Sequence, residues 1–391
     1  MMLNPFGPRI APTSIGAISA SLTVLLSLQS LSSSYGRFLV SAAGVGPAIS
    51  SNFPDPGLAL DTSTRTSGNG SQHGTWYAFS TQTGEINVQM ASSSDFSSWT
   101  LHRGYDALPT LPAWARKPPD AGVWAPDVNQ RPDGSWVMYF AAVGRSHPQK
   151  HCIGAATSPD VQGPYTPIED PIVCELARGG NIDPNLFVDP VNNESYLVYK
   201  VDGNAIGHGG ACGNTNAPVQ PTPLYLQLMD PEDLTTPIGK PVYLFSNMQS
   251  FKEDGPNVER PCMVFRNNAY YLLYNARCYA SPNYRIDYVS CVVGVDTHSG
   301  VLGCDWDALK AKQQLSPHHT LLRTGDTVSG TKLTAPGSMD VSPDQRRVVF
   351  HGDVNLDWFA PHHPSSVKRD RAMFAGEIDF VKSDLRITKL F

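Results

Sequence analysis

The chain has 391 residues, of which 41% are hydrophobic and 16% charged, and its formal net charge is −6. This composition is typical of a globular protein with a substantial core, and it lacks the basic excess that binding to nucleic acid requires. The 33 glycines and 33 prolines indicate many turns and few long helices.

The first 45 residues differ from the rest. An apolar, serine-rich run, IGAISASLTVLLSLQSL, covers residues 15–31 after a short segment that carries Arg9, and small residues follow at 39–44. This pattern is typical of a secretory signal. A membrane anchor is the alternative, but the run is shorter than the roughly 20 residues that a spanning helix needs. We therefore expect a signal peptide and short linker at 1–45, one domain at 46–391, and a secreted, extracellular protein without a membrane partner.

Seven cysteines fit an oxidising compartment, and their spacing matches no zinc motif. They are Cys152, Cys174, Cys212, Cys262, Cys278, Cys291 and Cys304. An odd number leaves at least one thiol unpaired in a monomer. Cys278 and Cys291 lie on consecutive predicted strands and could form a bridge, although the sequence does not fix the pairing. Two glycosylation sequons, at 69–71 and 193–195, agree with secretion.

One type of short strand recurs along the remaining chain. Each copy follows a turn rich in Gly, Asn or Asp, and a further candidate strand comes after it. The copies cover residues 75–81, 135–142, 195–201, 269–276 and 346–352. Five such units in a fixed order indicate an all-β, five-bladed β-propeller. A β-sandwich is the alternative, but it would require this spacing to arise by coincidence.

Acids stand beside prolines where four of the five units begin: Asp55, Asp127, Asp183 and Glu259. A single acid in this context is usually a turn residue. If the segments that carry them are the innermost strands, however, all four acids converge on one end of the central channel. The return strands would bring Asn275 and His351 to the same face. Clustered carboxylates repel, so their pKa values should spread, as an acid–base pair requires.

The motifs DPG, WAPDV, IDP and VERP, in this order between residues 53 and 353, resemble glycoside hydrolase family 43. This resemblance implies a secreted five-bladed propeller with its active site at one end of the channel. It implies an inverting hydrolase for α-L-arabinofuranosyl linkages in arabinan or arabinoxylan. A β-xylosidase or another specificity of the family, a retaining invertase-like propeller and a non-catalytic carbohydrate-binding propeller are the alternatives. The partner would be an oligo- or polysaccharide, and the protein a monomer.

The resemblance also implies roles for the acids. Asp55 would be the general base that activates water, and Glu259 the general acid, with Glu253 as the alternative. Asp183 would raise the pKa of the acid and hold it in place. An inverting enzyme needs the base and the acid roughly 6.5–9.5 Å apart. For substrate binding we expect Asp127 at the pocket floor, Trp124 as a stacking surface for sugar, and Asn275 and His351 in the channel.

Three features depart from the family pattern. Arg260 follows Glu259, where a small residue is usual, and strand alternation predicts that its side chain points away from the channel. Ser338 and Met339 follow the glycine after which many relatives carry a histidine near a metal or water. We therefore expect no metal ligands and no required cofactor, and the pattern argues against a structural calcium or sodium. The long, glycine-rich segment 204–223 is either a rim loop that shapes the pocket or a plain connection.

Overall fold

The computed structural model describes residues 44–63, 74–292, 299–313, 319–360, 362, 367–381 and 384–391. The apolar run at 15–31 of the expected signal peptide and the sequon at 69–71 lie outside these residues. Residues Ala42–Phe391 form one compact unit. Apart from short helices, this unit is built of β-strands, which confirms the predicted all-β class.

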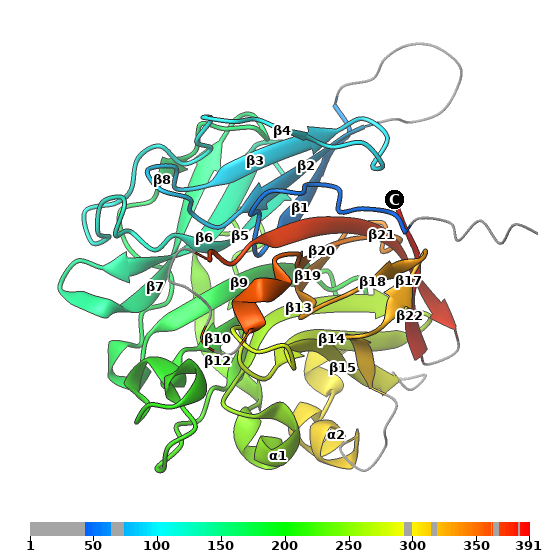
Figure 1. Ribbon diagram of the computed structural model, residues 1–391. Helices are drawn as coiled ribbons and strands as arrows, with labels where there is room; N and C mark the ends of the chain where they lie inside the picture. Colours follow the sequence, from blue (N-terminus) through cyan, green and yellow to red (C-terminus); the bar gives the residue numbers. More distant parts are fainter. Residues whose placement is uncertain are drawn as a thin grey trace, which may run out of the picture. The chain divides into compact units, whose positions relative to one another are not determined.

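Five four-stranded antiparallel sheets follow one another along the chain, and in each sheet the strands are paired in sequence order (Figure 1). They are the blades of a five-bladed propeller, as predicted. Blade 1 is β1 (Gly57–Asp61), β2 (Thr75–Ser80), β3 (Gln89–Ser93) and β4 (Thr100–Leu101). Blade 2 is β5 (Trp124–Gln130), β6 (Trp136–Gly144), β7 (His147–Ser158) and β8 (Thr166–Pro167). Blade 3 is β9 (Asn181–Val188), β10 (Ser195–Val201), β11 (Leu224–Met229) and β12 (Pro237–Phe245). Blade 4 is β13 (Val258–Arg266), β14 (Ala269–Ala276), β15 (Arg285–Val292) and β16 (Thr320–Arg323). Blade 5 is β19 (Gly337–Val341), β20 (Arg347–Asp353), β21 (Arg371–Val381) and β22 (Asp384–Leu390).

The first strands of the blades form a closed ring. Strand β1 contacts β5 and β19, β9 contacts β5 and β13, and β13 contacts β19. The segment before β1 also pairs with blade 5, because Ile49 and Met373 on β21 form two main-chain hydrogen bonds. The five inner strands therefore surround one channel, and a residue at the start of any of them lies near its mouth.

The recurring aromatic runs are the second strands. Every residue of β6, β10 and β14 is buried, because each strand is flanked by neighbours within its sheet and covered on both faces by adjacent blades. This is why these strands read as continuous apolar runs instead of alternating ones. Their burial gives each blade a rigid support for the inner strand in front of it.

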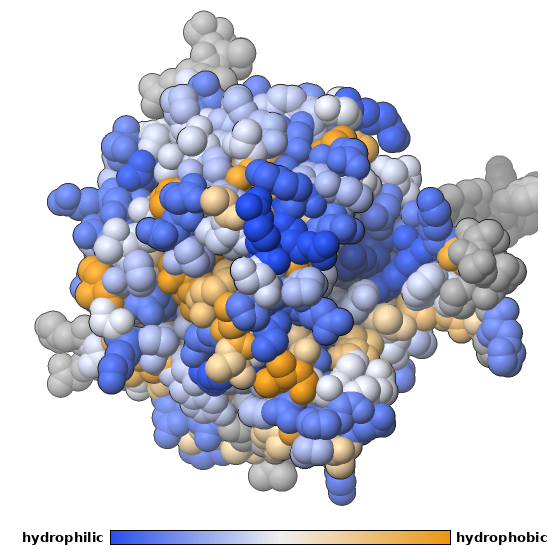
Figure 2. Space-filling view, turned by 90° about the vertical axis from the view of Figure 1, so that its left-hand side faces the viewer, coloured by the Kyte–Doolittle hydropathy of each residue, from blue (hydrophilic) through white to orange (hydrophobic). Residues whose placement is uncertain are grey.

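The remaining elements are short. They are the helices α1 (Phe251–Asp254) and α2 (Trp306–Gln313), the two-stranded β17 (Thr327–Val328) and β18 (Thr331–Lys332), and six 3₁₀ turns. The turns are η1 (Leu176–Arg178), η2 (Gly203–Ile206), η3 (Ala211–Gly213), η4 (Asn247–Ser250), η5 (Gly300–Gly303) and η6 (Leu356–Phe359). Within the described part of the chain, no helix has the length and apolar character needed to cross a membrane. On the face shown in Figure 2, apolar residues form small groups among hydrophilic ones.

Three disulfides join Cys152 to Cys174, Cys212 to Cys278, and Cys291 to Cys304. The suggested bridge between Cys278 and Cys291 is therefore wrong. Cys278 follows the end of β14, whereas Cys291 pairs with Tyr270 at the start of that strand, so the two thiols lie at opposite ends of the hairpin. The expected unpaired thiol is Cys262, which is buried on β13.

Candidate active site

A strained turn is repeated at the channel mouth in all five blades. One non-glycine residue at the start of each inner strand has a positive φ: Asp55 (54°), Ala125 (46°), Asp183 (59°), Arg260 (50°) and Ser338 (53°). In the first four blades a proline directly follows this residue. Proline restricts the backbone of the residue before it to extended conformations, so a positive φ at this position is unfavourable. Strained backbone of this kind concentrates at functional sites. The turn places five equivalent side chains around the channel.

Two of the four predicted acids, Asp55 and Asp183, occupy this repeated position. Glu259 comes one residue before it and Asp127 two residues after it, so the four acids are not equivalent. The side chains of Asp55, Asp183 and Glu259 nevertheless line one pocket of about 460 Å³, to which all five blades contribute. The structure thus brings the three predicted catalytic carboxyls together.

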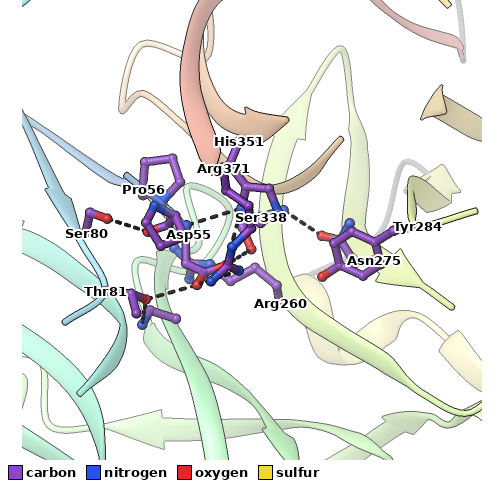
Figure 3. Close-up of polar contacts among 12 residues, drawn as sticks. Asp55, Pro56, Ser80, Thr81, Arg260, Asn275, Tyr284, Ser338, His351 and Arg371 are labelled. Carbon is purple, nitrogen blue, oxygen red and sulfur yellow. Dashed lines mark hydrogen bonds and ion pairs between the residues drawn. The ribbon is translucent and has the colours of Figure 1, made fainter. Parts of the chain in front are cut away.

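Asp55 is held by side chains from blades 1 and 5 (Figure 3). The Ser338 hydroxyl donates to Oδ1 at 2.6 Å, and the Thr81 hydroxyl donates to Oδ2 at 2.9 Å. Arg371 Nη1 lies 3.3 Å from both carboxylate oxygens. Burial acts to raise the pKa of Asp55, but the charge of Arg371, the neighbouring His351 and the Ser338 hydroxyl together hold that pKa well below its usual value. Asp55 is therefore ionised at neutral pH, as a general base must be.

Glu259 lies between a buried cation and a phenol. Its Oε2 accepts a hydrogen bond from Lys200 Nζ at 2.9 Å, and its Oε1 accepts one from the Tyr284 hydroxyl at 2.9 Å. Lys200 is completely buried and also lies 3.1 Å from Asp202. Burial acts to lower the pKa of Lys200, but Glu259 and Asp202 raise it above its usual value. These two partners fix the orientation of the Glu259 carboxyl in the pocket.

Asp183 is a proton-holding neighbour of Glu259. Its Oδ2 accepts the main-chain N–H of Arg260 at 2.9 Å. Burial and the negative charge of Glu259 raise the pKa of Asp183 to about 7, against the opposing charges of Lys200 and Arg260. The site therefore combines an ionised carboxylate, Asp55, with a second carboxyl, Asp183, whose raised pKa lets it retain a proton near neutral pH.

Asp127, which we expected at the pocket floor, is not among the residues that line this pocket, and its role in substrate binding stays a prediction. It lines a separate cavity of about 190 Å³ together with Asn185 and Asp340. Its Oδ2 accepts the main-chain N–H of Leu186 at 2.8 Å, and its Oδ1 accepts a hydrogen bond from Asn185 at 3.1 Å. Burial and the charge of Asp340 raise the pKa of Asp127 to about 7. Two residues beyond the turn, the strand has already carried this carboxyl into the channel wall.

Asn275 and His351 are buried and are not among the residues that line the pocket, and their predicted role in substrate binding stays a prediction. Asn275 Oδ1 accepts the main-chain N–H of Ser338 at 2.8 Å. His351 Nδ1 accepts the main-chain N–H of Asp55 at 3.2 Å, and burial lowers the pKa of this histidine, which keeps it neutral. Both side chains therefore support the turns that present Asp55 and Ser338.

Trp124, for which sugar stacking stays a prediction, lines the pocket and is partly exposed. Its side chain is 38% exposed, and it lies against the ring of His151 with a centroid distance of 3.8 Å. The glycine-rich segment 204–223 also contributes to the pocket, through Asn204, Cys212 and Gly213. It is a rim loop and not a plain connection.

The prediction that Arg260 points away from the channel was wrong. The side chain is 2% exposed and lines the pocket. Strand alternation does not apply at this residue, because its φ is positive and the register of β13 against β14 shifts between Glu259 and Cys262. Sequence reasoning also missed Thr81, Tyr284 and Arg371. These residues lie outside the inner strands. The sequence motifs identified site residues only at the starts of inner strands, so they gave no signal for these three.

A metal ion does not fit the residues of the channel. Among the residues that the structure describes, no group of three or more His, Cys, Asp or Glu side chains is arranged to hold one. Arg260 lines the pocket instead, and its positive charge interacts with four acids of the channel.

Comparisons with known proteins agree with this fold. The sequence model for Glycosyl hydrolases family 43 matches residues 69–304. An extracellular endo-α-(1→5)-L-arabinanase of Thermotoga petrophila is 29% identical over 153 residues, which is 32% of this chain and 31% of that protein. A thermostable family-43 glycoside hydrolase has a similar structure, with a TM-score of 0.59 and 21% identity, covering 88% of this chain and 94% of the other. An endo-1,4-β-xylanase of Bacteroides thetaiotaomicron gives a TM-score of 0.57 and 18% identity, covering 88% and 96%.

Proposed function

The chain belongs to glycosyl hydrolase family 43, and we propose that it hydrolyses α-L-arabinofuranosyl linkages of arabinan or arabinoxylan with inversion at the anomeric carbon. One observation carries this proposal: carboxyls from three blades, Asp55, Asp183 and Glu259, line the same pocket in different electrostatic surroundings. The arabinanase named among the relatives supports the choice of sugar. Because the match covers about a third of that protein, its substrate is adopted here as a proposal.

In the proposed reaction Asp55 takes a proton from water while the water oxygen attacks the anomeric carbon. Glu259 gives a proton to the leaving glycosidic oxygen as the C–O bond breaks, so that a free sugar and an alcohol result. Asp55 suits the first role because Arg371 and Ser338 keep it ionised. Asp183 suits a supporting role, because it lies beside the proposed acid and its raised pKa lets it hold a proton near neutral pH.

We further propose that the enzyme is secreted, acts as a monomer and needs no cofactor or metal. Secretion is supported by the extracellular arabinanase among the relatives and by the three disulfides. The pocket is lined by all five blades of one chain, which supports catalysis by a single copy. The channel acids have an internal cation in Arg260, which supports independence from metal.

The test is hydrolysis of aryl α-L-arabinofuranoside, aryl β-xyloside and linear arabinan, with the anomer first released followed by NMR. We expect turnover of the arabinofuranosyl substrates and an inverted first product. Preference for the xyloside would replace the proposed specificity with that of a β-xylosidase. A retained anomer would contradict the mechanism. Sugar binding without any hydrolysis would indicate a carbohydrate-binding propeller.

A further inference from the structure

Arg260 links two of the turns that carry the catalytic acids. Its guanidinium donates through Nη1 to the main-chain carbonyl of Pro184 at 3.2 Å and through Nη2 to that of Pro56 at 3.4 Å. These prolines directly follow Asp183 and Asp55. The main-chain N–H of Arg260 donates to the Asp183 carboxylate. One residue of blade 4 therefore connects blades 1, 3 and 4 across the channel, and Figure 3 shows its side chain beside Asp55 and Pro56.

The charge of this buried guanidinium serves several acids at once. Burial acts to lower the pKa of Arg260, but four surrounding carboxylates raise it: Asp340, Asp127, Asp183 and Asp55. The other cations of the site have dedicated partners, since Lys200 pairs with Glu259 and Asp202, and Arg371 with Asp55. The guanidinium of Arg260 donates its hydrogen bonds to main-chain carbonyls and not to a single carboxylate, so its positive charge acts on all four acids.

A buried cation is costly unless its surroundings compensate it, and so is a group of buried carboxylates. Here each cost offsets the other. An arginine suits this position because its planar fork reaches two carbonyls in a fixed geometry and stays charged at any working pH.

We propose that Arg260 is a positioning residue: the fixed counter-ion of the channel, which holds the turns of Asp55 and Asp183 at their catalytic spacing and does the work that a bound cation would otherwise do. It touches neither the water nor the leaving oxygen in the proposed reaction. Arg260 influences turnover only through the carboxyls that it positions. The test that measures activity therefore rests on the proposed function, whereas the test that measures stability does not.

The first test needs no substrate. In Arg260→Met the channel carboxyls lose a shared positive charge, so their pKa values rise further and their ionisation costs more. The folded state then binds more protons than the unfolded chain over a wider range, and stability falls more steeply as pH rises from about 4. We expect the Tm difference between wild type and variant to grow from about pH 4 to about pH 8. A difference that stays constant over this range would overturn the proposal, because loss of packing alone has no such pH dependence.

Arg131→Met is the matched control. The Arg131 guanidinium also donates to a main-chain carbonyl, that of Asp233 at 3.1 Å, but it lies outside both channel cavities. Its Tm difference should not change in the same way with pH. Arg260→Lys keeps the charge and loses the fork, so its Tm difference should vary little with pH. If Arg260→Met does not fold, Arg260→Gln replaces it as the uncharged variant. The proposal would be overturned if the Tm difference from wild type grew with pH as much in Arg260→Lys as in Arg260→Gln.

The second test follows kcat and KM across pH on an aryl arabinofuranoside. Arg260→Met should lower kcat by about tenfold to a hundredfold, with a smaller change in KM, because the acids are misplaced while the sugar contacts remain. Its alkaline limb should move to higher pH, since Asp183 loses a charge that favours its ionised form. An unchanged limb would overturn the proposal. If wild type hydrolyses none of the substrates, the proposed function fails, and the Tm test still decides the role of Arg260.

Discussion

Arg371 on β21 of blade 5 places its guanidinium Nη1 3.3 Å from both carboxylate oxygens of Asp55 in blade 1. The same guanidinium lies 5.6 Å from the ring of Tyr279. The proposed base is therefore paired with a cation from the last blade of the propeller. Closure of the ring between blades 5 and 1 is needed to form this pair, so correct assembly of the fold and ionisation of the base depend on each other.

We predict that Arg371→Met moves the acid limb of the kcat/KM profile to higher pH. The charge of Arg371 is the largest influence that lowers the pKa of Asp55, so its removal lets Asp55 take up a proton at a higher pH. The base is then lost over a range in which wild type is active. Arg371→Lys should move the limb less. Arg323→Met is the control, since that side chain is 69% exposed, and it should leave the limb unchanged.

Asp183→Asn should move the alkaline limb of activity to lower pH and reduce kcat. In wild type, burial and Glu259 raise the pKa of Asp183 to about 7, so Asp183 keeps a proton up to that range and loses it above. An asparagine at position 183 cannot hold this proton, so the site is already without it below pH 7. The measurement is kcat as a function of pH on an arabinofuranoside with a poor leaving group. A limb at or above the wild-type position would show that Asp183 does not act on the acid.

Glu259→Gln separates the roles of the two candidate acids. We expect hydrolysis of linear arabinan to fall by about a hundredfold to ten thousandfold, the usual contribution of a general acid or base. Turnover of an aryl arabinofuranoside with a good leaving group should fall much less, because its departure needs no proton. Glu253→Gln is the matched control, since Glu253 lies on α1 outside the pocket lining. If Glu253→Gln has the larger effect on arabinan, the acid has been assigned to the wrong residue.

The second strands of the propeller could be predicted because burial on both faces leaves a continuous apolar run in the sequence. The outermost strands could not. Seven of the nine residues of β12 are exposed, and β4 and β8 have two residues each, so neither apolar runs nor alternation mark them. The sequence also indicated which segments carry the acids, since each acid stands beside a proline of an inner strand.

The direction of individual side chains at the channel mouth was not predictable in the same way. In blade 2 the residue that matches Asp55 is Ala125, and Asp127 follows the proline instead of preceding it. The sequence therefore predicted equivalent positions for these acids, because each stands near a proline, although their side chains enter different cavities of the channel. In blade 4 the same positive φ and shifted register turn Arg260 into the channel, where alternation had predicted the opposite. Backbone strain, which leaves little trace in residue type, decides both outcomes.

Asp127→Asn should flatten the dependence of stability on pH. Burial and Asp340 raise the pKa of Asp127 to about 7, so between about pH 4 and pH 7 the folded chain holds a proton that the unfolded chain has lost. Wild-type stability therefore falls as pH rises through this window, and an amide removes that contribution. Urea unfolding at several pH values measures the slope. Asp120→Asn, at a side chain that is 66% exposed, should leave the slope as in wild type.

The disulfide between Cys212 and Cys278 should set the affinity for substrate more than the rate of the chemical step. Cys212 lies on the rim loop of the pocket, and Tyr279, next to Cys278, also lines the pocket. Replacing both cysteines by serine frees the two walls from each other, so we expect a higher KM with a smaller change in kcat. Cys291→Ser with Cys304→Ser is the control, because neither residue lines the pocket. From sequence separations of 66 and 13 residues, the chain-entropy model gives about 4 and about 3 kcal/mol of stability. Both double variants should therefore lose Tm, and only the first should raise KM; an equal rise in both would mean that general loosening of the fold, and not the rim, controls binding.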